Sequence, residues 1–60
     1  MYKVIRCTDK KLVGKIYGYT NTGALINKLT EDYSGFTTIT IKGDTIQLRG
    51  SNLTMILQSV

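Results

Sequence analysis

The clearest pattern of apolar and polar positions lies in the second half of the chain, where apolar side chains alternate with polar ones. The alternating apolar residues are Ile39, Ile41, Ile46 and Leu48. A period of two predicts strands that bury one face. The intervening Gly43-Asp44 predicts a two-residue hairpin turn, because glycine takes a positive φ at low steric cost. This turn pairs Lys42 with Thr45 and places the aliphatic side chains on one face.

A second chain reversal is predicted within the stretch RGSNL. A tight turn at Ser51-Asn52 and one at Gly50-Ser51 both keep the faces consistent, and either gives a three-stranded meander over residues 36–60. Its apolar wall consists of Ile39, Ile41, Ile46, Leu48, Met55 and Leu57. Ile56 and Val60 point to the other face, so the last strand is apolar on both sides. That pattern indicates burial against another element or another subunit.

The N-terminal segment also alternates and predicts a hairpin, in which a reversal at Asp9-Lys10 pairs Ile5 with Gly14. One side is interpreted as core and carries Ile5, Cys7, Leu12, Gly14 and Ile16. The other side mixes tyrosines, valines and cations: Tyr2, Val4, Arg6, Val13, Lys15, Tyr17 and Tyr19.

Between the two halves, apolar residues recur at helical spacing, which predicts a helix over residues 23–34. The residues that recur are Leu25, Ile26, Leu29 and Tyr33. Asn21 or Thr22 is the expected N-cap, and Gly35 the expected left-handed residue after the helix. The predicted fold is therefore α+β, in the order ββαβββ, with one helix packed on one face of a small antiparallel sheet.

Three stretches, GKIYGYTNTGALINKL, SGFTTI and KGDTIQLR, resemble RNA-binding OB domains of the ribosomal-protein type. The resemblance implies an alternative fold, a small OB-like β-barrel. The chain departs from the family pattern where residues 24–33 favour a helix and Gly43-Asp44 favours a tight hairpin. No family membership is inferred, and no residue role is transferred.

The 60 residues form a single domain, 1–60, whose core is small. Cys7 is the only cysteine and the chain has no histidine, so neither an internal disulfide nor a zinc site is expected, and no cofactor. A small core and a doubly apolar last strand predict a homo-oligomer, most simply a dimer. Without a signal peptide or a long apolar run, we expect a cytoplasmic protein with no membrane partner.

The residues offer no catalytic constellation, so the protein is not expected to be an enzyme. No histidine is present to act as a base near neutral pH. Asp9 and Asp44 fall in predicted turns, while Glu31 and Asp32 are neighbours near a helix end. Cys7 is interpreted as a buried structural thiol.

The net charge is +4, with eight basic and four acidic residues, and the basic residues concentrate near the N-terminus. Such asymmetry is typical of proteins with an anionic partner. The predicted binding residues share the mixed side of the N-terminal hairpin: Tyr2, Arg6, Lys15, Tyr17 and Tyr19. Aromatic rings stack on unpaired bases and cations contact the backbone, so single-stranded DNA or RNA is the first predicted partner.

The alternative prediction is a protein–protein interaction module of the phage or mobile-element type, which inhibits or adapts a host protein. Such a module would dock through the same face or through an exposed strand edge.

Overall fold

The computed structural model describes residues 1–60 as one helix, one short 3-10 helix and a five-stranded antiparallel sheet. In chain order the elements are β1 (Tyr2–Cys7), η1 (Lys10–Leu12), β2 (Ile16–Tyr17), α1 (Thr22–Asp32), β3 (Phe36–Lys42), β4 (Thr45–Gly50) and β5 (Thr54–Ser59). This order confirms the predicted ββαβββ fold. The sheet is open, so the alternative of a closed OB-like barrel is wrong.

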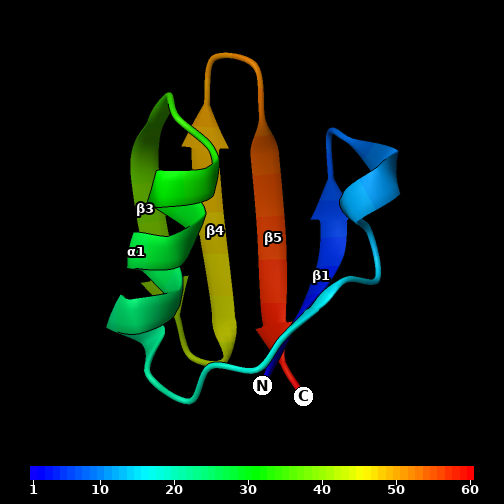
Figure 1. Cartoon of the computed structure of the whole chain (residues 1–60), viewed down its shortest axis with the longest axis vertical. Coiled ribbons are helices and arrows are strands. Elements are labelled where there is room, and N and C mark those ends of the chain that lie inside the picture. Colours follow the sequence, from blue (N-terminus) through cyan, green and yellow to red (C-terminus); the bar gives the residue numbers. More distant parts are fainter.

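The strand order β2-β1-β5-β4-β3 places the N-terminal strand beside the C-terminal one. β1 pairs with β5, with Val4 opposite Leu57, and the two chain termini lie next to each other (Figure 1). β5 is therefore an interior strand with a neighbour on each side. This position pairs both edges of β5, while Met55 and Leu57 face the core and Ile56 lies on the opposite face of the sheet.

The two hairpins of the meander have the predicted register. Lys42 lies opposite Thr45, and Leu48 lies opposite Met55, which puts the second turn at Ser51-Asn52. Gly43 has a φ of +58° and no non-glycine residue has a positive φ, so the first turn is of type II′. Glycine is needed there because a side chain would make this φ strained.

The helix α1 lies on one side of the sheet, in front of β3 and β4 in Figure 1. Its N-cap is Asn21, whose side-chain oxygen accepts a hydrogen bond from the Ala24 N–H at 3.2 Å. Leu25 and Leu29 are fully buried against the sheet, as predicted. The helix ends at Asp32, before the predicted boundary, because Tyr33 is already extended.

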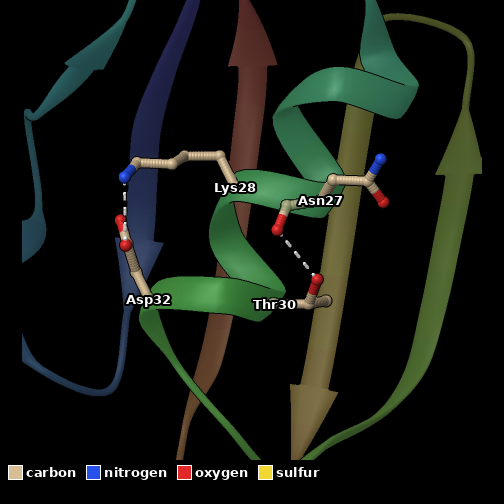
Figure 2. Close-up of polar contacts among 4 residues, drawn as sticks. All are labelled: Asn27, Lys28, Thr30 and Asp32. Atoms are coloured by element: carbon tan, nitrogen blue, oxygen red, sulfur yellow. Dashed lines mark hydrogen bonds and ion pairs between the residues drawn. The ribbon is translucent and has the colours of Figure 1, made fainter.

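The exposed side of α1 carries the chain's one salt bridge, between Lys28 Nζ and Asp32 Oδ1 at 3.2 Å (Figure 2). The hydroxyl of Thr30 donates a hydrogen bond to the Asn27 carbonyl at 3.0 Å. A carboxylate near the C-terminus of a helix opposes the helix dipole, and the pairing with Lys28 offsets this effect. The hydrogen bond and charge of Asp32 raise the pKa of Lys28 above its ordinary value.

The N-terminal hairpin keeps its predicted strand offset but presents the opposite face to the core. Tyr17 lies opposite Tyr2 in the observed register, and η1 replaces the predicted tight turn. Val4 is fully buried, whereas Ile5 is 46% exposed and Ile16 55% exposed. The predicted core side is therefore wrong.

A β-bulge in β1 explains why this reversal does not extend to Cys7. The pairing between β1 and β5 shifts between Val4 and Arg6, so Ile5 drops out of the ladder. The extra residue restores Cys7 to the same face as Val4, and both join the core. Cys7 is thus buried, in agreement with the predicted structural thiol.

The six residues of the apolar wall share one face of the sheet, but only four of them are buried. Ile46, Leu48, Met55 and Leu57 are at most 1% exposed. Ile39 is 40% exposed and Ile41 is 56% exposed, although the sequence predicted that both belong to the apolar wall. Both lie on β3, the outermost strand, beyond which no element of the chain packs.

Candidate functional site

The structure separates the five residues predicted to form one binding face. Tyr2 is half-buried on the side of α1, where its hydroxyl lies 3.1 Å from the Thr22 hydroxyl. Tyr17 is 7% exposed and belongs to the core, and Tyr19 packs against that core. Most of the aromatic surface expected to stack on bases is therefore used to bury the protein's own interior.

The two cations of the predicted set lie on different faces. Lys15 lies over the Tyr17 ring, with its Nζ 5.0 Å from the ring centroid. Arg6 on β1 pairs with Ile56 on the neighbouring strand β5, and both side chains lie on the face turned away from α1. The expectation that these residues share one open face is wrong, because β1 turns Tyr2 toward the helix while the bulge at Ile5 turns Arg6 to the opposite face.

The Tyr17 hydroxyl is the one buried side-chain polar atom with no hydrogen-bond partner. The hydroxyl of its half-buried neighbour Tyr33 lies close enough to interact with it, but the two hydroxyls do not form a hydrogen bond of good geometry. Burial raises the pKa of Tyr33 above its ordinary value of 10.0, and the nearby Tyr17 adds to this rise. These phenols therefore belong to the packing between α1 and the sheet rather than to a solvent-facing site.

The face of the sheet turned away from α1 is uncovered, and we call it the open face. Residues directly opposite each other on antiparallel strands point to the same side of the sheet, which assigns the members of this face. They are Ile16 on β2, Lys3 and Arg6 on β1, Thr38, Thr40 and Lys42 on β3, Thr45, Gln47 and Arg49 on β4, and Thr54, Ile56 and Gln58 on β5.

The open face carries four cations and no carboxylate. Asp9 and Asp44 are in turns, and Glu31 and Asp32 are at the end of α1. All four cations, Lys3, Arg6, Lys42 and Arg49, are exposed, and none is in a salt bridge. The open face is therefore uniformly positive.

The cations lie around the perimeter of the open face. Lys3, Gln58, Thr45 and Lys42 form one cross-strand row. Three strand spacings separate the ends of this row, which puts Lys3 and Lys42 about 14 Å apart at their backbones. Arg49 pairs with Thr38, so it lies about 14 Å from Lys42 along the strand direction. The centre of the face holds the uncharged side chains of Ile56 and Gln47.

Sequence reasoning identified one of these four cations, Arg6, and missed the other three as members of a site. The alternation in residues 38–49 already assigned Lys42 and Arg49 to the polar side of the meander. No local signal showed that β1 would join this sheet beside β5 and bring Lys3 and Arg6 to the same side.

No other candidate site emerges from the chain. The surface has no pocket, and no group of three potential metal ligands is gathered. The helix α1 is not long and apolar enough to cross a membrane. Comparisons of the chain with protein-family models, with curated proteins and with solved structures gave no match.

Proposed function

We propose that this chain is a non-catalytic nucleic-acid-binding protein that contacts its ligand through the open face. The observation that carries the proposal is the grouping of Lys3, Arg6, Lys42 and Arg49 on one uncovered sheet face without a carboxylate. Unpaired cations on a flat surface release condensed counterions from a phosphate backbone, and this supplies much of the affinity for nucleic acids.

Duplex DNA suits this face better than the single strand predicted from the sequence. Single-strand binding without sequence preference depends on aromatic rings, and the open face has none. The major groove of B-DNA is about 12 Å wide, close to the spacing of about 14 Å across the cations. Cations at the perimeter would meet phosphates on both sides of the groove, while the flat face itself stays outside it.

Fluorescence anisotropy with a labelled duplex, at a series of salt concentrations, tests the proposal. Four phosphate contacts predict a slope of about −3 to −4 in a plot of log K against log salt. A single strand of the same sequence should bind more weakly. An absence of binding to the duplex at low salt would refute the proposal. Tighter binding to the single strand would refute the preference for duplex DNA.

A matched pair of variants separates the open face from general charge. The double substitution Lys42→Glu with Arg49→Glu should abolish binding, because it reverses half of the cations on the open face. Lys10→Glu with Lys11→Glu changes the net charge by the same amount on η1, outside that face. Equal losses from the two variants would show that net charge alone attracts the ligand.

The second candidate is a module that binds a protein partner. The observation that favours it is the uncovered edge of β3, where an extended segment of another chain could add a strand. Affinity purification with and without nuclease distinguishes the two functions. A stoichiometric partner that resists nuclease supports the protein-binding function.

A further inference from the structure

The sheet ends in two edges of unequal length. β2 is an edge strand of two residues, while β3 is an edge strand of seven. Pairing between β3 and β4 is regular from Thr38 to Lys42, bounded by a register shift between Phe36 and Thr38 and by the turn at Gly43. Edge strands usually carry prolines, charged side chains or covering elements, and this five-residue segment has none of these except Lys42 at its end.

The backbone groups that face outward from this segment belong to Ile39 and Ile41. In a two-residue hairpin the closing pair, here Lys42 and Thr45, exchanges both of its hydrogen bonds. Alternation then directs the N–H and C=O of Thr40 toward β4, and those of Ile39 and Ile41 away from it. The same two residues have exposed side chains, at 40% and 56%. Unpaired backbone groups and unburied apolar surface therefore coincide.

We propose that β3 pairs antiparallel with β3 of a second copy of this chain, about a two-fold axis through Thr40. Ile39 then lies opposite Ile41 of the partner subunit, and Ile41 opposite the partner's Ile39, as hydrogen-bonded pairs. Four backbone hydrogen bonds form, and the four isoleucine side chains meet on the side of the helices. Cross-strand pairs of this kind are the unit of sheet stabilisation.

The regular segment favours this register over its neighbours. Thr40 is the middle residue of Thr38–Lys42, so an axis there uses all five residues of both copies. An axis at Ile39 would bring the irregular Thr37 into the ladder, and an axis at Ile41 would extend pairing onto the turn at Gly43.

The register also keeps like charges apart. Lys42 lies opposite Thr38 of the partner subunit, which holds the two lysines about 14 Å apart along the strands. A two-fold axis perpendicular to the sheet keeps both helices on one side. The two open faces then form one continuous surface with twice the cations. The pairing itself needs no ligand, so its test is independent of the proposed nucleic-acid binding.

Disulfide trapping of the protein without nucleic acid tests the register. Thr40 is exposed and would lie opposite its own copy, with the Cα atoms about 4.5 Å apart, a separation that a disulfide can span. We expect Thr40→Cys to form a covalent dimer under mild oxidation. Thr38→Cys is the matched control, because its copies would lie about 14 Å apart. The unmodified chain controls for Cys7, which is buried.

Sedimentation analysis supplies the second measurement. We expect the unmodified chain to show a mass above that of a monomer at about 100 µM, since a contact of this size is weak. Ile41→Lys should return it to a monomer. Ile16→Lys is the control, because Ile16 is equally exposed, at 55%, on the opposite edge. Dimers unaffected by Ile41→Lys, a monomer at all concentrations, or equal crosslinking of Thr40→Cys and Thr38→Cys would overturn the proposal.

Discussion

Replacing Tyr17 with phenylalanine removes a single oxygen atom, the one that is buried without a hydrogen-bond partner. An unsatisfied buried hydroxyl loses its hydration on folding, which costs about 1–3 kcal/mol. The phenylalanine ring keeps the buried apolar surface and the contact with Lys15. We therefore expect Tyr17→Phe to raise the free energy of unfolding by about 1–2 kcal/mol. For a domain of this size, 1 kcal/mol corresponds to a rise in Tm of about 4–8 °C.

Tyr2→Phe is the matched control, because it makes the same chemical change to a hydroxyl that has a partner. The Tyr2 hydroxyl lies 3.1 Å from the Thr22 hydroxyl, and its loss should lower the free energy of unfolding by about 0.5–1.5 kcal/mol. Urea unfolding at neutral pH, with both variants fitted to the same m-value, measures the two effects. If Tyr17→Phe destabilises the protein as Tyr2→Phe does, the Tyr17 hydroxyl has a partner and the reasoning fails.

Further expected outcomes concern the end of one strand, the core and alkaline pH. Gly50→Ala should lower stability by about 1–3 kcal/mol, since its Cβ would come within 2.5 Å of a backbone carbonyl, while Gly18→Ala, with no atom within 4 Å, should be nearly neutral in thermal unfolding. Leu29→Ala should cost about 2–5 kcal/mol in urea unfolding, and Ile39→Ala much less, because the former is fully buried and the latter is not. The raised pKa of Tyr33 means that the unfolded chain loses this proton first. Its contribution to stability is therefore fully present below pH 10.0 and is lost as pH rises through the folded pKa. Urea midpoints measured between pH 8 and pH 12 should fall less steeply in Tyr33→Phe, and an unchanged profile would contradict this cause.

The sequence by itself determined the elements whose signals are local. The two-residue turn at Gly43 fixes which residues of β3 and β4 face each other, because one residue of slip would exchange the faces. The cap at Asn21 and the buried pair Leu25 and Leu29 define the helix in the same way. In each case the conformation is determined by a few residues that are close together in the sequence.

The tertiary structure decided which face of the N-terminal hairpin is buried. Both faces of that hairpin carry apolar side chains, so periodicity assigns neither to the core. The pairing of β1 with β5 joins residues at opposite ends of the chain, and the irregularity at Ile5 shifts the alternation within a single strand. Neither feature has a local signature, because each is set by the fit of β1 against a sheet that the rest of the chain has built.

The candidate site depends on this same tertiary choice. Once Val4 and Tyr17 turn inward to complete a small core, alternation turns Lys3 outward, and the bulge at Ile5 turns Arg6 outward as well, onto the same face as Lys42 and Arg49. The sequence thus determined that the protein has cations and a polar sheet face. Only the assembly of the sheet decided that they coincide, because the burial of Val4 turns Lys3 outward and the bulge formed against β5 brings Arg6 to the same face.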